Sequence, residues 1–174
     1  MTCIVGLTYN GGAIMAGDGL LSLGGTQLAC GEPKIHKQGK LIIGASGTGR
    51  ECDLILTAPL PKPRLTDPYG WAVEKVVPML WKRFGDAGLL DSSSSPLEAM
   101  MLLAVPGTLL GIDSQGGVFS YLDGYGAIGS GMDIAMGVLA GTAQCQPITR
   151  IARVITACNT HCAGVGDPWT IETI

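Results

Sequence analysis

The order of strand-like and helix-like segments constrains the fold of this chain most, because its helices are clustered and do not alternate with strands. Two β-hairpins open the chain, each a pair of β-rich runs around a turn that contains glycine. The turns are Asn10-Gly11-Gly12 and Gln38-Gly39. The predicted strands are 3–9, 13–16, 34–37, 40–45, 100–106, 109–113, 118–122 and 169–174.

Helical patterns fall in pairs between these groups of strands. The second helix carries apolar residues at spacings of three and four from Val73 to Phe84, which is typical of a helix facing a core. Pro78 lies inside it and is predicted to kink or split it. A Ser-rich loop is predicted at 91–96. The predicted helices are 47–58, 69–84, 131–143 and 147–162.

This order predicts an α+β fold in one domain over residues 1–174. The first two hairpins are expected to form one sheet and the strands at 100–122 a second, antiparallel one. Clustered helices argue against a βαβ fold and favour a four-layer αββα sandwich of two antiparallel sheets with helix pairs outside.

Composition excludes several classes of function. Eleven Lys and Arg against 14 Asp and Glu give a net charge of −3, with no basic run, so nucleic acid is not an expected partner. No apolar run approaches the roughly 20 residues of a membrane span, and no secretory signal is visible, so we expect a cytoplasmic protein. The six cysteines have no metal-ligand spacing, so no metal is expected. Residues 124–129 match GxGxxG, but without a βαβ unit they are a weak dinucleotide signal.

Thr2 carries the chemistry that stands out. Removal of Met1 would leave Thr2 with a free α-amine, whose usual pKa of about 7.7 to 8.0 lets it act as general base for its own hydroxyl. One residue can then be both nucleophile and base. Cys3 would point to the opposite face of the strand and is interpreted as core.

From Thr2 to Asp18, the chain resembles the N-terminal block of the proteasome β-subunit and HslV family of N-terminal-nucleophile hydrolases, most of all the small bacterial and phage proteasome homologues. The resemblance continues through Lys34, the 45–48 turn and Gly129-Ser130-Gly131. It implies the αββα N-terminal-nucleophile hydrolase fold, a threonine peptidase that needs no cofactor, and self-association into rings that cleave peptides or unfolded proteins inside a chamber. It leaves the regulatory ATPase partner open.

The same resemblance assigns roles to individual residues. Thr2 is the nucleophile, and Lys34 holds positive charge beside it while paired with Asp18. Ser130 bonds the threonine amine. The backbone around Ser46 and Gly47 forms the oxyanion turn, and Ser22 falls at a substrate-contacting position.

The chain departs from the family pattern at Gly19-Leu20-Leu21, where the family has an Arg-containing sequence, at Ser46, where it has the oxyanion glycine, and in the last helix. The family's Asp-x-x-Ser in the last helix, which supports the threonine amine, is Asn159-x-x-Cys162 here, so a carboxylate and a hydroxyl are missing and low activity is predicted. The residues therefore leave two alternatives open. One is a proteasome-like ring with little or no activity that acts as a scaffold or binding chamber, and the other is an amidase for small amides.

Overall fold

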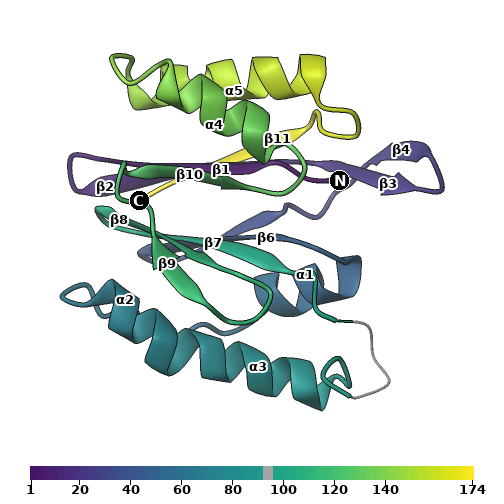
Figure 1. Ribbon diagram of the computed structural model, residues 1–174, viewed down its shortest axis with the longest axis vertical. Helices are drawn as coiled ribbons and strands as arrows, with labels where there is room; N and C mark the ends of the chain where they lie inside the picture. Colours follow the sequence, from purple (N-terminus) through teal and green to yellow (C-terminus); the bar gives the residue numbers. More distant parts are fainter. Residues whose placement is uncertain (92–95) are drawn as a thin grey trace.

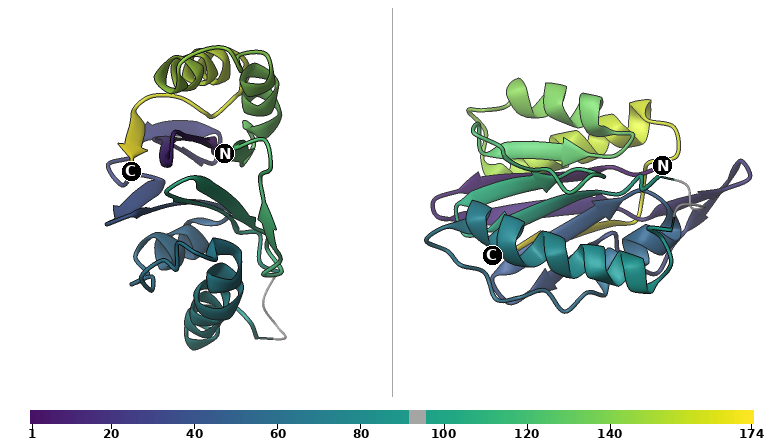
Figure 2. Two further views of the ribbon diagram at one scale, coloured as in Figure 1. Left: turned by 90° about the vertical axis from the view of Figure 1, so that its left-hand side faces the viewer. Right: turned by 60° about the horizontal axis from the view of Figure 1, so that its bottom comes forward.

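The computed structural model describes residues 1–91 and 96–174, and its elements stack in four layers (Figure 1). Two antiparallel sheets lie face to face, with one group of helices above them and another below, and Figure 2 shows the same layers from two further directions. The predicted αββα sandwich is confirmed. The helical segments are α1 (Gly49–Leu56), α2 (Pro68–Trp71), the π-helical turn η1 (Ala72–Val76), α3 (Val77–Asp86), α4 (Met132–Ala140) and α5 (Pro147–His161).

The strands divide into two main sheets and one separate hairpin. The first sheet has the order β10-β1-β2-β11, and the second has the order β5-β6-β7-β8-β9. In the part of the chain that the structure describes, β3 pairs with β4 alone. The strands are β1 (Ile4–Tyr9), β2 (Gly12–Asp18), β3 (Leu20–Leu23), β4 (Thr26–Ala29), β5 (Ile35–Gln38), β6 (Leu41–Ser46), β7 (Met100–Val105), β8 (Thr108–Ile112), β9 (Val118–Ser120), β10 (Tyr125–Ile128) and β11 (Trp169–Thr173).

The prediction that the first two hairpins share one sheet is wrong. Hairpin β1–β2 pairs on its two edges with β10 and β11, from the C-terminal part of the chain. Hairpin β5–β6 instead joins β7, β8 and β9 in the other sheet. Turn signals predict which neighbouring strands pair, but they do not say which distant strands complete a sheet.

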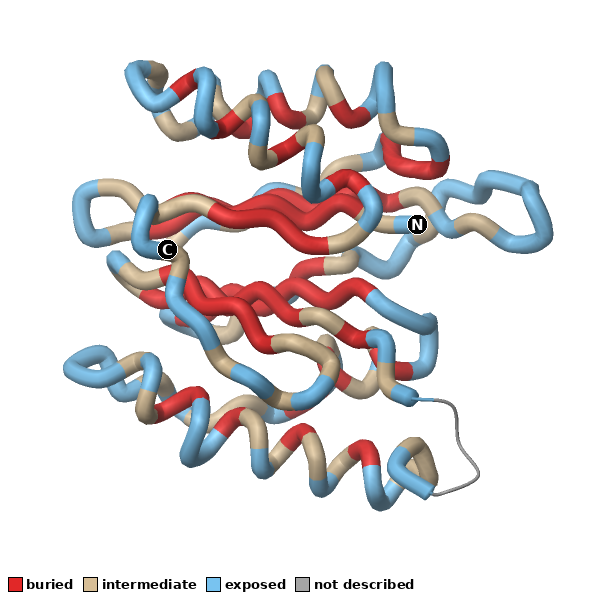
Figure 3. The backbone as a smooth tube through the Cα atoms, in the orientation of Figure 1, coloured by how far each residue is buried: buried red, intermediate tan, exposed pale blue. Residues whose placement is uncertain are grey.

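Three strands, β3, β4 and β10, were absent from the prediction. The β3–β4 hairpin turns at Gly24 and Gly25, whose φ angles of +55° and +87° suit glycine. It extends from the stacked sheets, and its tube is coloured mostly as exposed (Figure 3). Strand β10 covers part of the GxGxxG match at 124–129 and pairs antiparallel with β1, so this segment is not the strand-to-helix turn of a dinucleotide site. Residues 92–95 of the predicted Ser-rich loop lie outside the described residues.

Side chains along β1 alternate between the two faces of the first sheet, so the strand contributes to two buried clusters. Cys3, Val5 and Leu7 pack under α4 and α5 in one buried cluster, whereas Ile4 faces the space between the two sheets. Cys3 is fully buried, as predicted. By the same alternation, Thr2 is directed to the side of Ile4, at the end of the space between the sheets.

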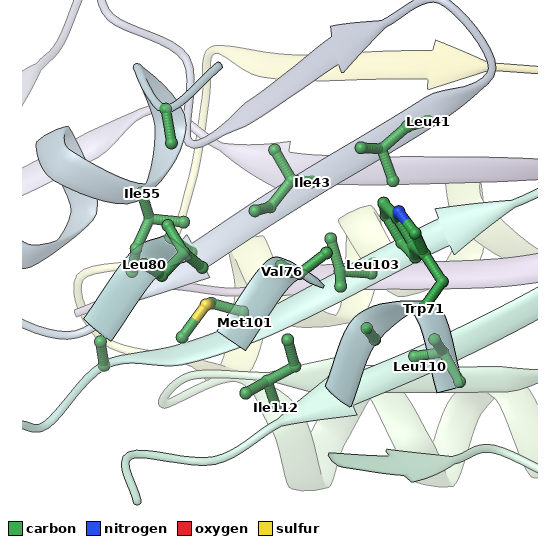
Figure 4. Packing of buried hydrophobic residues seen from close by; sticks show 14 of the residues in the cluster. Leu41, Ile43, Ile55, Trp71, Val76, Leu80, Met101, Leu103, Leu110 and Ile112 are labelled. Carbon is green, nitrogen blue, oxygen red and sulfur yellow. The ribbon is translucent and has the colours of Figure 1, made fainter. Parts of the chain in front are cut away.

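The helical segment that contains Pro78 is divided, as predicted. Pro78 lies in the first turn of α3, directly after η1. There the Val77 N–H donates to the Ala72 carbonyl, a wide turn that accommodates a following residue without an N–H. Trp71, Val76 and Leu80 from this segment pack on the second sheet against residues such as Leu103 (Figure 4).

Candidate active site

Thr2 comes just before β1, next to the end of the ladder in which β1 pairs with β10. Ile4 pairs with Ile128 in that ladder, so the same register brings Thr2 opposite Ser130. The Thr2 N–H donates to Ser130 Oγ at 3.1 Å, and the Ser130 hydroxyl donates to the Thr2 carbonyl at 3.2 Å. The Gly131 N–H also donates to the Thr2 carbonyl, at 3.1 Å. The backbone of Thr2 is thereby fixed by the segment that leads into α4.

Gly129 makes this approach possible. Its φ angle is +87°, and a Cβ atom there would collide with the carbonyl oxygen of Thr2. Glycine is therefore required both by the backbone conformation and by the contact. The predicted Gly129-Ser130-Gly131 segment is next to Thr2 in the structure.

Asp18 and Lys34 form a buried ion pair beside this segment. The Lys34 ammonium lies 3.0 Å from both Asp18 carboxylate oxygens, and the Asp18 side chain has no exposed surface. The same carboxylate accepts the Cys3 N–H at 2.8 Å and the Leu20 N–H at 3.2 Å. Asp18 thus joins the start of β1 to the start of β3 and fixes the lysine between them.

The Lys34 ammonium and the Thr2 hydroxyl meet at one oxygen atom. Lys34 Nζ donates to the Met1 carbonyl at 3.0 Å, and Thr2 Oγ1 donates to the same carbonyl at 2.8 Å. Lys34 also donates to the Leu20 carbonyl at 2.6 Å. Because they share this acceptor, the positive charge of Lys34 lies near the Thr2 hydroxyl.

Ser46 and Gly47 lie across a cavity from the Thr2 backbone. The cavity has a volume of about 270 Å³, and its walls include Thr2, Ser46, Gly47 and Ser130. Gly47 has a φ angle of +145°, and a Cβ atom there would lie 2.8 Å from the Cα of Ala99. The turn after β6 therefore needs glycine, and its backbone borders the same space as the hydroxyl of Thr2.

Glu51 holds this turn, and the sequence analysis missed it. Its buried carboxylate accepts the Thr48 N–H and the Glu98 N–H, each at 2.9 Å. The Thr48 side chain in turn accepts the Glu51 N–H, so the two residues form a capping box at the start of α1. The spacing Thr-x-x-Glu before an apolar run is a readable signal for this arrangement.

Ser22 lies close to Met1. Its Oγ is buried and has no hydrogen-bond partner among residues 1–91 and 96–174. A Cβ atom placed on Gly164 would lie 3.0 Å from Ser22 Oγ and 3.2 Å from Met1 Cβ. The segment around Gly164 therefore packs on both residues. Ser22 and Met1 lie together on the β3 side of Thr2.

Asn159 and Cys162 make their hydrogen bonds with other residues. The Asn159 amide donates to the Asp167 carboxylate at 2.8 Å and accepts the Trp169 indole N–H at 2.9 Å. Cys162 Sγ lies 4.0 Å from the Ala163 carbonyl. Within the described residues, neither side chain has a hydrogen bond to Thr2.

Cys158, one turn before Cys162, is the thiol of α5 that packs behind Thr2. Its Sγ lies 3.6 Å from Cys3 Sγ and 3.9 Å from the Gly131 carbonyl. The hydrogen bond with Cys158 and burial both raise the pKa of Cys3, so Cys3 stays a neutral thiol. The family pattern in the sequence pointed to positions 159 and 162 and gave no signal for Cys158.

Comparison with solved structures gives the same architecture over the whole chain. BPH from Thiobacillus denitrificans, in complex with epoxomicin, superposes with a TM-score of 0.78 at 19% identity, covering 99% of this chain and 98% of that one. HslV from Trypanosoma brucei superposes with a TM-score of 0.71 at 17% identity, covering 99% and 98%. This chain has the fold of HslV and the proteasome β-subunits.

A third relative of this HslV-like fold is Anbu, an ancestral β-subunit from Yersinia bercovieri. It has a TM-score of 0.70 at 13% identity, and the alignment covers 99% of this chain and 81% of Anbu. No protein-family model matches the sequence. The similarity therefore lies in the fold, and the chemistry of the HslV-like chain has to be argued from its own residues.

Residues 1–91 and 96–174 contain no group of three or more His, Cys, Asp and Glu side chains arranged to hold a metal ion. In the same residues, none of the helices combines the length and the apolar character that crossing a bilayer requires.

Proposed function

We propose that this chain is a proteasome-like threonine peptidase whose nucleophile is Thr2 after removal of Met1. One observation carries the proposal: the Thr2 hydroxyl and the Lys34 ammonium both donate to the Met1 carbonyl oxygen, while Ser130 bonds the Thr2 nitrogen. Removal of Met1 would free both donors on the same side of Thr2. In this arrangement Thr2 would be the nucleophile, Lys34 the charge that stabilises its oxygen and Ser130 the partner of its amine.

The proposed reaction is acyl transfer to the threonine. With Met1 gone, the Thr2 amine is free and takes the hydroxyl proton through a water molecule. Thr2 Oγ1 attacks the substrate carbonyl carbon, and the N–H groups of the turn at Ser46 and Gly47 stabilise the oxyanion. The peptide bond breaks, the amine product leaves, and water hydrolyses the ester. Lys34, held by Asp18, stabilises the threonine oxygen as its negative charge develops.

We further propose self-association into rings in the cytoplasm, with peptides or unfolded proteins as substrates. Large apolar side chains on the surface support an interface between copies. Leu122 is 96% exposed and Leu23 57% exposed, in addition to Ile148 at 55%. A site enclosed by copies of the chain would restrict cleavage to polypeptides that enter it.

The alternative function is a ring that serves as a scaffold or binding chamber with little activity. The hydrogen bonds of Asn159 to Asp167 and Trp169 favour it, because they leave the Thr2 amine without support from that position of α5.

The test compares the wild-type protein with Thr2→Ala and Thr2→Ser. Intact mass is expected to show loss of Met1 in an active sample, and fluorogenic peptides measure hydrolysis. Thr2→Ala is expected to abolish turnover without loss of folding, because among the described residues the Thr2 hydroxyl bonds only the Met1 carbonyl. Thr2→Ser should retain turnover. Thr160→Ala, the same change on the exposed face of α5, is the control. If Thr2→Ala hydrolyses the peptides as fast as the wild-type protein does, the assignment of Thr2 as nucleophile is refuted. If the wild-type protein forms rings that hydrolyse none of the peptides, the scaffold function is favoured.

A further inference from the structure

A second, smaller cavity opens beside Thr2 on the side of β3 and α1. It has a volume of about 140 Å³ with Met1 in place, and Met1, Thr2 and Lys34 form part of its wall. At about 30 Å³ for each water molecule, this is room for one side chain and not for a drug-sized ligand. Apolar side chains make up much of the wall: Leu20, Leu21, Ala45 and Leu56.

Two carboxylates belong to the same wall. Glu32 comes from the segment between β4 and β5, and Asp53 from α1. Neither forms an ion pair with any of the described residues, although Cys30 Sγ donates to Glu32 Oε2 at 3.2 Å. The cation in the wall, Lys34, is already neutralised by the buried carboxylate of Asp18.

The thiol of Cys52 also belongs to the wall. Burial, followed by the charges of Glu51 and Asp53, raises the pKa of Cys52 to about 11. Cys52 lines the cavity and stays neutral near pH 7, so it contributes apolar surface. The cavity therefore combines an apolar wall with two carboxylates that lack a cationic partner.

We propose that this cavity binds a lysine or arginine side chain of the substrate, on the residue next to the bond that Thr2 attacks. The inference rests on the proposed peptidase function and adds the class of substrate. The methylene groups of such a side chain pack on the leucine wall, while its charged end reaches Glu32 and Asp53. An acidic side chain would be repelled, and an apolar one would desolvate the two carboxylates without pairing them.

The first arm of the test is cleavage of matched fluorogenic peptides with Arg, Lys, Leu or Glu before the scissile bond. We expect kcat/KM to be highest for Arg and Lys and to fall with added salt. Glu32→Gln and Asp53→Asn, singly and together, should lower kcat/KM for the Arg peptide, by roughly tenfold for the pair. They should raise kcat/KM for the Leu peptide, because its side chain no longer desolvates two charges. Asp123→Asn removes one negative charge in the turn before β10, outside the cavity wall, and is the matched control.

The second arm measures binding and does not depend on turnover. Fluorescent peptides that end in Arg, Leu or Glu are titrated into the wild-type protein and the same variants, with circular dichroism as a check of folding. The Arg peptide should bind most tightly, and the double variant should lose that preference.

The two arms separate the two proposals. If no peptide is cleaved but the Arg peptide binds preferentially through Glu32 and Asp53, the cavity assignment holds and the peptidase function fails. If peptides are cleaved with Leu or Glu preferred, or if the double variant leaves the Arg preference intact in both arms, the cavity assignment is overturned and the peptidase function stands.

Discussion

The buried pair of Asp18 and Lys34 gives the sharpest prediction about stability. Asp18→Asn keeps the shape of the side chain and an oxygen for the Cys3 N–H, but it removes the negative charge that faces the Lys34 ammonium at 3.0 Å. Breaking a buried pair from one side costs about 3 to 5 kcal/mol, because an uncompensated charge remains. Lys34 is 16% exposed, which lets some water reach it. We therefore expect Asp18→Asn to lower the free energy of unfolding by about 3 kcal/mol, the lower end of this range.

The assay is urea unfolding, followed by circular dichroism. With a denaturant dependence of about 2 kcal/mol per molar urea, the midpoint should fall by about 1.5 M. Asp86→Asn is the control, because it removes the carboxylate of an exposed pair with Lys82 and should cost at most about 0.5 kcal/mol. The double variant Asp18→Asn with Lys34→Met should lose less than the sum of the two single variants, since no unpaired charge is left.

Two results would refute this reasoning. One is a loss for Asp18→Asn no larger than for Asp86→Asn, which would mean that the pair is solvated like a surface pair. The other is strict additivity in the double variant, which would mean that the two charges do not interact.

The remaining predictions concern α5 and the cavity wall. Asn159→Asp should lower the free energy of unfolding by about 1 to 2 kcal/mol at pH 7, because it would place a second carboxylate at the 2.8 Å contact with Asp167. Protonation relieves this repulsion, so the loss should vanish near pH 4 in urea unfolding, and Asn159→Asp with Asp167→Asn should recover stability; a stable and more active Asn159→Asp would contradict the observed bonding. Cys52, with its pKa raised to about 11, should react with iodoacetamide about a hundredfold more slowly at pH 8 than an ordinary thiol. Peptide mass spectrometry follows the alkylation of Cys52, whose rate should rise with pH up to about 11 and be faster at pH 8 in Asp53→Asn. Alkylation of the wild-type protein at pH 8 as fast as that of an ordinary thiol would show that Cys52 is not held neutral.

Local signals in the sequence predicted most elements, because turns and periodicity are properties of neighbouring residues. The turn after β1 has φ angles of +41° at Asn10 and +79° at Gly11, which the Asn-Gly pair suits. The same logic failed for β10, because Gly126 and its flanking glycines resemble a loop. Its strand character comes from pairing with β1, which no local pattern contains.

The candidate site was predictable where a residue type is required by its chemistry or its backbone. Thr2, Lys34 and Gly47 belong to this group, and the structure brings each of them to the edge of a common space. The partners of Asn159 could not be predicted, because Asp167 and Trp169 reach it from the loop and strand after α5. Likewise, the packing of Cys158 on Cys3 depends on where α5 lies across the first sheet.

The pairing of β1 and β2 with strands from the far end of the chain also sets the order in which the molecule can fold. Strands β5 to β9 follow one another in sequence and form their sheet among themselves. Strands β1 and β2 can complete their sheet only when β10 and β11, from the C-terminal part of the chain, pair with them. Contacts between nearby residues form fastest, so pulse-labelling hydrogen exchange should protect β6, β7 and β8 before β1 and β2. During synthesis, the surroundings of Thr2 would then be assembled last, once Ser130 and β11 have been made. A partly synthesised chain therefore contains Thr2 without Ser130 and β11, which lie around it in the folded structure.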